Sequence, residues 1–264
     1  MVEFTQKETY DFQDLVQIIS LLRGPGGCPW DREQTHESIR RNFIEEAYEA
    51  VEAIDEQDAD HLEEELGDVL LQILLHAEME REKGGFDING VANRLSQKMI
   101  LRHPHVFGEV KVSGSEEVLT NWDAIKRVEK DQKTVTDSLN SVARSLPSLW
   151  RAEKVQKKAA KAGFDWPDVT GALDKLEEEI RELREAVAEG KGIEGELGDV
   201  LFSAVNVSRF LKIDPEEALT GSTDKFIRRF AGMEQAASDI GKKPEEMTLE
   251  EMDELYNKAK EREV

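Results

Sequence analysis

The hexapeptide ELGDVL occurs twice in this chain, at residues 65–70 and again at 196–201. Other landmarks recur around it in the same order. EEAYE at 45–49 is matched by EEIRE at 178–182, and KMILR near residue 100 is matched by KFIRR near residue 227. A long ordered repeat of this kind indicates two copies of one module. The chain is therefore limited to folds that about half of its 264 residues can form twice.

Each copy is predicted to be entirely helical, because its apolar residues recur at intervals of three and four. The predicted helices span about 10–22, 37–54, 59–83, 89–101 and 116–131 in the first half, and 147–162, 169–189, 194–211, 215–230 and 249–261 in the second. Glycine and proline separate them, as in RGPGGCPWD at 23–31. The sequence predicts an all-α fold of two tandem four-helix-type modules, 1–131 and 138–264, joined by a polar linker at 132–137.

The charge balance excludes several classes of protein. The formal net charge is −22, from 57 acidic and 35 basic residues, so the chain should repel nucleic acid and anionic membranes. A single cysteine, Cys28, excludes a disulfide scaffold and a cysteine-based zinc site. Apolar runs are far shorter than the roughly 20 residues of a transmembrane helix, and the first residues do not resemble a signal peptide. We expect a cytoplasmic protein without nucleic-acid or membrane partners.

Carboxylates are spaced for a metal site in both copies. In the first copy, Glu46 and Glu49 share one helical face, and Glu65 and Asp68 share another. On consecutive antiparallel helices, four such side chains can converge, repel one another and raise one another's pKa. A hard divalent cation, Mg²⁺ with Mn²⁺ as a possible substitute, relieves that repulsion. An acidic run such as EExxE alone is more typical of a solvated helix face.

Basic residues follow each acidic pair at a spacing that suits phosphate binding. Lys98 and Arg102 in the first copy, like Lys225 and Arg229 in the second, are four residues apart on the next helix. They are equally typical of ordinary surface charge pairs. No glycine-rich phosphate loop occurs in the sequence. All five histidines lie in the first half, so a histidine-ligated metal cannot be the shared chemistry. We expect His76 to be a packing or capping residue and not a metal ligand.

Several segments give the chain a family resemblance. GGCPWDREQTH, HPHVF, NWDAIK and KAGFDW, together with the two acidic blocks, resemble the MazG family of nucleoside triphosphate pyrophosphohydrolases in its long, tandem-domain form. The resemblance covers essentially the whole chain. It implies two helical MazG modules assembled as a homodimer, and Mg²⁺-dependent hydrolysis of a nucleoside triphosphate to the monophosphate and pyrophosphate.

The resemblance also implies roles for individual residues. The family's metal ligands correspond to Glu179, Glu182, Glu196 and Asp199 in the second copy and to Glu46, Glu49, Glu65 and Asp68 in the first. The family's nucleotide-contacting basic pair corresponds to Lys225 and Arg229, and a late aromatic position of the family corresponds to Tyr256. Apart from the resemblance, the other candidate substrate-binding residues are Lys175, Lys191 and Asn206, with Lys98 and Arg102 in the first copy. Lys191 is one residue before the position where the family has lysine, which is Gly192 here. Glu178, and Glu45 in the first copy, are candidates to orient or deprotonate a metal-bound water that attacks the α-phosphorus.

One difference between the copies favours the second as the principal active site. After Asp199, the same helical face carries Ser203 and Asn206, whereas the corresponding residues of the first copy are Gln72 and Leu75. Asn206 should lie about 10 Å along the helix from Asp199, within reach of the sugar or base of a bound nucleotide. Its amide can donate and accept hydrogen bonds there, or it can merely satisfy a buried backbone group.

Two other functions are compatible with the same pattern. A catalytically inert helical interaction module would show no Mg²⁺ binding and no release of pyrophosphate. A phosphohydrolase of a non-nucleotide pyrophosphate would turn over without dependence on a base. Neither the preferred base and sugar nor the role, whether clearance of damaged nucleotides or a stress response, follows from the sequence.

Overall fold

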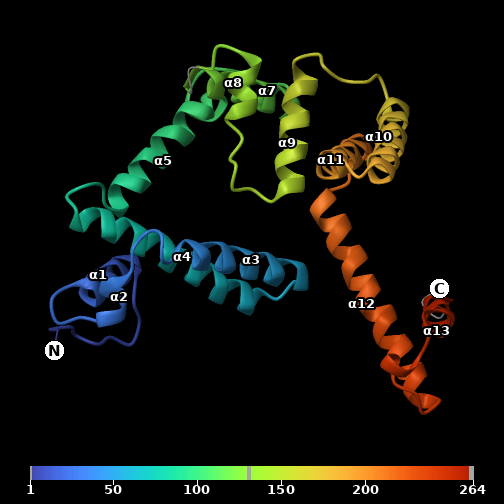
Figure 1. Ribbon diagram of the computed structural model, residues 1–264. Helices are drawn as coiled ribbons and strands as arrows, with labels where there is room; N and C mark the ends of the chain where they lie inside the picture. The colour runs from blue at the N-terminus through green and yellow to red at the C-terminus, as the bar shows by residue number, and fades with distance from the viewer. Residues whose placement is uncertain (1, 130–131, 262–264) are drawn as a thin grey trace. The chain divides into compact units, whose positions relative to one another are not determined.

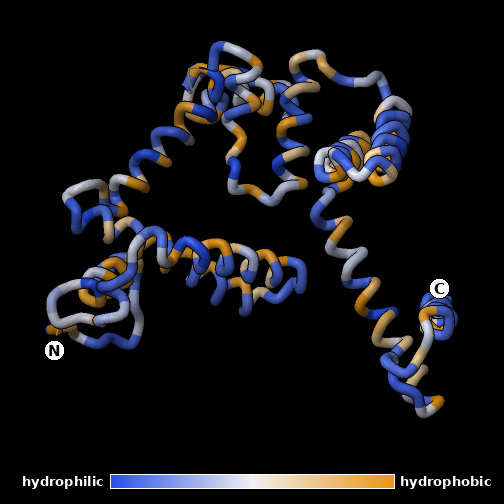
Figure 2. The backbone as a smooth tube through the Cα atoms, viewed as in Figure 1, coloured by the Kyte–Doolittle hydropathy of each residue, from blue (hydrophilic) through white to orange (hydrophobic). Residues whose placement is uncertain are grey.

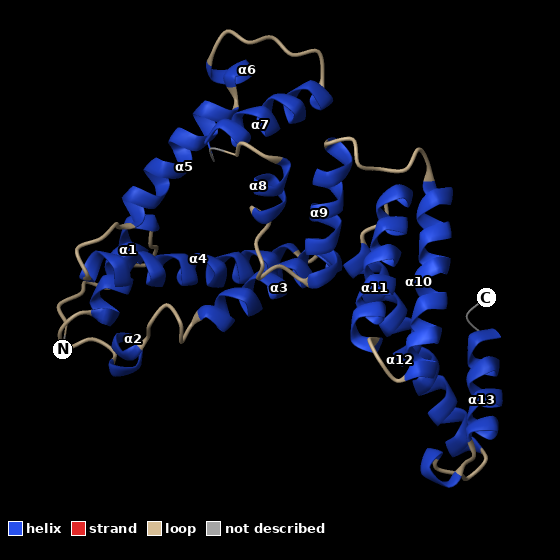
Figure 3. Ribbon diagram, turned by 45° about the horizontal axis from the view of Figure 1, so that its top comes forward, coloured by secondary structure: helices blue, strands red, loops and turns tan. Residues whose placement is uncertain are grey.

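Every regular element in the described part of the chain, residues 2–129 and 132–261, is helical (Figure 3). The computed structural model contains, in chain order, α1 (Phe12–Arg23), α2 (Pro29–Glu33), α3 (Arg40–Glu56), α4 (Ala59–Glu82), α5 (Ile88–Arg102), α6 (Pro104–Phe107), α7 (Ser115–Glu129), α8 (Val135–Asn140), α9 (Ser148–Lys161), α10 (Val169–Glu189), α11 (Ile193–Leu211), α12 (Pro215–Asp239), the 3₁₀ helix η1 (Pro244–Glu246) and α13 (Leu249–Glu261). The predicted all-α class is confirmed. No described helix has both the length and the apolar character that a membrane span requires.

The chain divides into two compact units, Met1–Lys126 and Arg127–Val264. The limits predicted for the modules at 131 and 138 stay a prediction. Three short helices, α2, α6 and α8, were not predicted, and α8 begins inside the segment expected to be linker because Thr134 caps it. A helix of only four to six residues contains too few apolar residues for their spacing to be recognised in the sequence.

Helix α12 is longer than predicted, ending at Asp239 and not at Phe230. Met233 and Ala237 explain the extension, because both are fully buried and continue the apolar spacing of the helix. Figure 2 shows hydrophobic segments recurring along this helix. In the first copy, α5 ends at Arg102 immediately before His103 and Pro104, as the sequence predicted.

The core of the first unit lies where α1 packs on α4. Its buried members are Ile19, Ile39, Leu74, Leu75 and Met79. Arg23, at the end of α1, fixes the following loop by donating to the carboxylate of Glu82 at 2.9 Å and to the backbone carbonyls of Asp31 and Gln34. A buried guanidinium with all these acceptors holds the glycine-rich loop against α4.

Two histidines occupy a neighbouring position in the first unit. The Nδ1 atoms of His36 and His76 are 2.7 Å apart, and the two rings are stacked. Nε2 of His36 lies 2.7 Å from a carboxylate oxygen of Glu80, and Phe43 meets the edge of His76. His76 is therefore a packing residue, as expected.

The acidic blocks lie on two helix pairs, α3 with α4 and α10 with α11, whose members run side by side (Figure 1). Tight turns create both pairs. Gly190 and Gly192 adopt φ values of 67° and 77° between α10 and α11, a left-handed conformation that glycine adopts without strain. Gln57 takes the equivalent position after α3, and Asp58 then caps α4. Because each turn is so short, the second helix must return along the first.

In the second unit, Asp214 joins α9 to the start of α12. Its carboxylate caps α12 through the backbone N–H groups of Glu216 and Glu217, and it also accepts from Nε1 of Trp150 at 2.9 Å. Burial would raise the pKa of Asp214, but these hydrogen bonds outweigh burial and hold its pKa below the usual value.

We expect Asp214→Ala to lower the free energy of unfolding of the second unit by about 1–3 kcal/mol, since a helix cap is lost and a partly buried indole N–H loses its acceptor. The matched control is Asp168→Ala, which removes a cap from α10 but no tryptophan contact, and which should lower the free energy of unfolding by about 1 kcal/mol.

The effect of Asp214 should also depend on pH, because its pKa is lowered in the folded state. Its contribution to stability is fully present above its pKa in the unfolded chain, about 3.9, and is lost as the pH falls through its pKa in the folded protein. Denaturant unfolding at pH 7 measures the first effect, and a series at falling pH below 4 measures the second. Equal losses in the two variants at pH 7, or a loss that does not shrink as the pH falls along the series, would contradict this role.

Candidate active site

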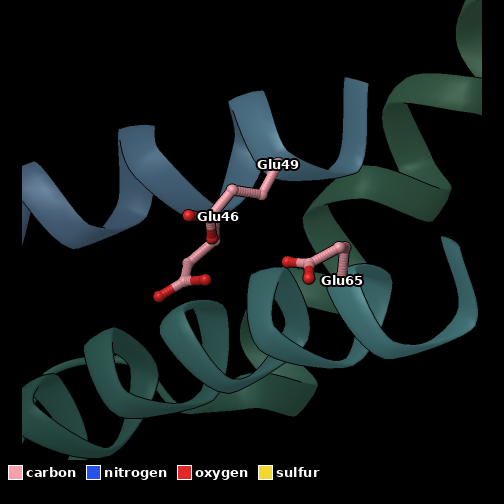
Figure 4. A group of neighbouring side chains, drawn as sticks. All are labelled: Glu46, Glu49 and Glu65. Carbon is pink, nitrogen blue, oxygen red and sulfur yellow. The ribbon is translucent and has the colours of Figure 1, made fainter. Parts of the chain in front are cut away.

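In the first unit, three predicted metal ligands converge between α3 and α4. Oxygen atoms of Glu46, Glu49 and Glu65 all lie within 4.8 Å of one another (Figure 4). Oε2 of Glu65 is buried and has no hydrogen-bond partner. Burial raises the pKa of Glu46, and the charges of Asp68 and Glu49 raise it further. The cluster is thus an array of crowded oxygen donors, with Asp68 close enough to act on it but outside the three-residue group.

A histidine at this cluster was missed. His61 lies one turn before Glu65, with Nε2 3.3 Å from a Glu65 oxygen and Nδ1 3.4 Å from Glu56. Burial lowers the pKa of His61, but the neighbouring carboxylates outweigh burial and leave the pKa raised. The four-residue spacing from Glu65 was visible in the sequence and could have indicated this contact.

The second unit repeats the arrangement between α10 and α11. Oxygen atoms of Glu179, Glu196 and Asp199 lie within 4.8 Å of one another, and Glu179 is 5% exposed. The fourth predicted ligand, Glu182, lies near them. Burial raises its pKa, and the charge of Glu179 adds to that effect. The predicted ligands therefore come together in both copies, three as a tight group and the fourth beside it.

Lys175 distinguishes the second cluster from the first. Its Nζ lies 2.6 Å from an oxygen of Glu179 and 2.8 Å from an oxygen of Glu178. These bonds raise the pKa of Lys175 and lower the pKa of Glu178. The first copy has Asn42 at the matching position, and there Glu45 pairs outside the cluster with Nε of Arg41 at 2.6 Å. The candidate bases Glu178 and Glu45 are thus both ion-paired.

The other predicted substrate-binding residues lie on separate elements. Lys191 is exposed in the turn between α10 and α11, and Lys225 is exposed on α12. Arg229 lies further along α12 beside Leu255 and Lys258 of α13. The Tyr256 ring is 5.8 Å from Phe226, and so lies against the helix that carries Lys225. The structure thus joins the aromatic residue to the helix of the basic pair.

In the first copy, the basic pair has a different environment. Lys98 is half-buried on α5, and Arg102 is buried with its guanidinium 6.0 Å from the ring of Trp122. Lys126 lies over the same ring at 4.2 Å. Arg102 and Lys126 therefore both lie beside an aromatic side chain from the NWDAIK segment.

A cavity of about 370 Å³ opens beside the second acidic cluster, between α9, α10 and α11. Glu179 and Asp199 form part of its wall, and Ser203 and Asn206 continue that wall along α11. Ser203 and Asn206 were predicted to follow Asp199 on one face of this helix, and all three line the cavity. Gln156, Trp166 and Arg209 also line it and were missed, although Trp166 belongs to the KAGFDW segment already singled out.

These features define a class of protein, an all-α chain with a carboxylate centre repeated on two helix pairs. A family model described as the MazG nucleotide pyrophosphohydrolase domain matches residues 34–107 and 169–231, which contain both acidic clusters. The chain belongs to the MazG family and carries two copies of its domain. It is therefore an enzyme, a hydrolase of phosphoric anhydride bonds.

Individual relatives extend over most of the chain. A nucleoside triphosphate pyrophosphohydrolase/pyrophosphatase MazG of Thermotoga maritima is 46% identical over 94% of this chain and 95% of its own length. A nucleoside triphosphate pyrophosphohydrolase of Escherichia coli is 41% identical over 95% and 97% of the two chains. The Bacillus subtilis protein YabN, which is uncharacterized, is 51% identical, but the match covers 52% of its length. The tandem arrangement is therefore shared nearly end to end with the first two.

We expect Glu46→Gln to stabilise the metal-free first unit. Because the pKa of Glu46 is raised in the folded state, that state binds more protons than the unfolded chain above about pH 4.3, and stability falls as the pH rises through the folded pKa. In EDTA at pH 7, the variant should therefore melt at a higher temperature than the wild type. Added Mg²⁺ should reverse the order, because a cation at a hundred times its Kd stabilises the intact cluster by about 2.7 kcal/mol.

Sodium chloride at matched ionic strength controls for the high net charge of the chain. If NaCl stabilised the wild type as much as Mg²⁺ did, or if both proteins gained equally from Mg²⁺, the cluster would not be a cation site.

Proposed function

We propose that this enzyme hydrolyses nucleoside triphosphates to the monophosphate and pyrophosphate in a Mg²⁺-dependent reaction, with the second unit as the principal active site and the cytoplasm as its location. The observation that carries the proposal is the cluster of Glu179, Glu196 and Asp199 at the wall of a cavity large enough for part of a nucleotide. The printed names of the relatives from Thermotoga maritima and Escherichia coli support the substrate class.

The residues of both clusters fit a hard divalent cation. All the donors are carboxylate oxygens, as Mg²⁺ and Mn²⁺ prefer, and the unpartnered Oε2 of Glu65 is a buried acceptor that a cation would satisfy. When bound, such a cation would neutralise phosphate charge and lower the pKa of a water molecule attached to it. The ligands would be Glu179, Glu182, Glu196 and Asp199, with Glu46, Glu49, Glu65 and Asp68 in the first copy.

Lys175 and Glu178 supply the remaining groups close to the second cluster. Lys175 holds Glu179 and Glu178 together, so a Glu179 carboxylate that turned to a cation would free the ammonium group to bind a phosphate oxygen. Glu178, with its pKa held low, would orient an attacking water toward the α-phosphorus. Lys191, Lys225, Arg229 and Tyr256 remain candidates for contacts with the leaving pyrophosphate and the nucleoside.

Unpartnered apolar faces support a homodimer. On α10, Leu173, Ile180 and Val187 recur every seven residues and are 40–59% exposed. On α11, Leu197 and Leu201 are similarly exposed, at 48% and 52%. A seven-residue apolar repeat on one helix, next to a second apolar stripe, is typical of a surface that packs on other helices. We propose that a second copy of the chain covers this surface around a two-fold axis.

Assay of a panel of nucleoside triphosphates with Mg²⁺ should detect monophosphate and pyrophosphate as the first products, since no phosphate loop holds the γ-phosphate. Glu179→Gln with Glu182→Gln should abolish most of this activity, whereas Glu46→Gln with Glu49→Gln, the matched change in the first unit, should retain most of it. A nucleoside diphosphate as the initial product would refute the proposed reaction. If Glu46→Gln with Glu49→Gln abolished the activity and Glu179→Gln with Glu182→Gln did not, the principal active site would lie in the first unit.

The chain should sediment as a dimer at micromolar concentration. Charges on the α10 face, introduced by Ile180→Arg with Val187→Arg, should shift it to monomers, because two buried cations would lack partners. Leu249→Arg is the control, since Leu249 is 73% exposed and lies on a different helix, at the start of α13. Sedimentation of the wild type as a monomer would contradict the proposal.

A further inference from the structure

The cavity beside the second acidic cluster is walled by amide and aromatic side chains as well as by carboxylates. Glu179 and Asp199 lie on its wall where a metal would hold the phosphates of a substrate. The other lining groups come from α9, from the loop before α10 and from further along α11. A ligand whose phosphates bound the cluster would thus have its remaining atoms next to these groups.

Gln156, on α9, lines the cavity and carries an unused hydrogen-bond acceptor. The residue is 6% exposed, and its Nε2 donates to the backbone carbonyl of Phe202 at 2.8 Å. This bond fixes the amide, while its Oε1 is buried without a hydrogen-bond partner. A buried acceptor with no donor is costly, so it marks a place where a ligand N–H would be favourable.

Asn206 adds a donor of fixed orientation. Its Oδ1 accepts from Nε of Arg209 at 2.8 Å, so the N–H groups are the part of its amide left for a ligand. Arg209 is itself held by both carboxylate oxygens of Asp165, in the loop before α10. The donor is therefore positioned by an ion pair that spans two elements, and Asn206 is 7% exposed.

An aromatic surface completes the cavity. Trp166 lies against the start of α10 at Gly171, where an added Cβ would meet the indole at 2.3 Å. Only glycine at that position allows the ring to pack so closely on the helix. Phe164 and Phe202 line the same cavity. Flat apolar rings beside a fixed acceptor and a fixed donor suit a heteroaromatic ring with N–H and ring-nitrogen groups.

The first copy lacks the same combination. Leu75 stands where the second copy has Asn206, and it is buried with Ile19 and Met79 in the hydrophobic core. Glu78 replaces Arg209 and pairs with Arg81 on its own helix. The acids are shared between the copies, whereas the amide and the ion pair that positions it belong to the second copy.

We propose that this cavity is the nucleobase subsite of the second unit, and that Oε1 of Gln156 accepts a hydrogen bond from an exocyclic amino group of the base. The assignment rests on the proposed function, which supplies the nucleotide. It makes Gln156 a specificity-determining residue and Asn206 a second contact to the base. Trp166, held on Gly171, provides the surface on which the base stacks.

The test compares nucleotides that differ only by an amino group. These pairs are ATP with purine riboside triphosphate, GTP with inosine triphosphate, and CTP with pyrimidin-2-one riboside triphosphate. In at least one pair, the wild type should favour the amino-bearing substrate by about tenfold in kcat/KM, because the analogue leaves a buried acceptor unpaired. Gln156→Leu should lower kcat/KM for that substrate to the value of its analogue and leave the analogue within about twofold.

Three further measurements separate this inference from folding effects and from the proposed function. Gln72→Leu is the matched control, because Gln72 is a buried glutamine of the first unit whose Oε1 also lacks a partner, and it should leave the substrate ratio unchanged. Asn206→Leu installs the residue of the first copy and should weaken the binding of every nucleotide. Calorimetry of the binding of the corresponding monophosphates measures the preference for the amino group without any turnover.

A wild type with no amino preference in any pair, or a preference that survives Gln156→Leu, would overturn the inference while leaving triphosphate hydrolysis intact. If no triphosphate were hydrolysed but monophosphate binding still depended on Gln156, the proposed reaction would fail and the subsite would stand. If Gln156→Leu proved unfolded by its melting curve, the more nearly isosteric Gln156→Met, which also removes the acceptor, would be compared with the wild type in monophosphate binding. A preference unchanged from the wild type would overturn the inference, and a reduced one would support it.

Discussion

Repulsion among carboxylates gathered between two helices is the constraint on which the rest of the structure depends. Three acidic side chains whose oxygens lie within 4.8 Å of one another are unfavourable unless something neutralises them. The helix pairs hold them together through tight turns, left-handed at Gly190 and Gly192 in one copy and at Gln57 in the other. Folding therefore concentrates negative charge between the two helices of each pair.

The two copies relieve this repulsion in different ways. In the second, the ammonium group of Lys175 lies against Glu179 and acts as an internal counter-ion. In the first, His61 lies against Glu65 and carries a full charge only when protonated. The ammonium group of a lysine stays charged throughout the physiological pH range, whereas a histidine does not. The identity of the counter-ion thus separates two sites whose acids are the same.

A difference between α4 and α11, the second helix of each acidic pair, accounts for the remaining asymmetry. Leu75 and Asn206 occupy corresponding positions, yet one completes a hydrophobic core and the other lines a cavity. A leucine at this position joins the apolar cluster beside the acids, whereas an amide requires partners and a cavity in which to find them. Corresponding helices can therefore support a packed interior in one unit and a cavity in the other.

Much of the fold and part of the site follow from the sequence alone. Helix positions, the repeat and the shared face of each acidic pair are local properties, set by spacing of three and four residues. Family membership also follows, because its segments are contiguous. The limits of short helices such as α2 and α8 do not, since a single capped turn carries almost no periodicity.

Only the tertiary structure decided which distant side chains meet. Gln156 bonds to Phe202, 46 residues away, and Arg209 bonds to Asp165, 44 residues away. His36 stacks on His76 across 40 residues. Helical periodicity tells which residues share a face, but not which face of another helix lies opposite, because that depends on how the helices pack. The sequence by itself therefore determined the acids and the helices that carry them, while packing determined the cavity beside the acids.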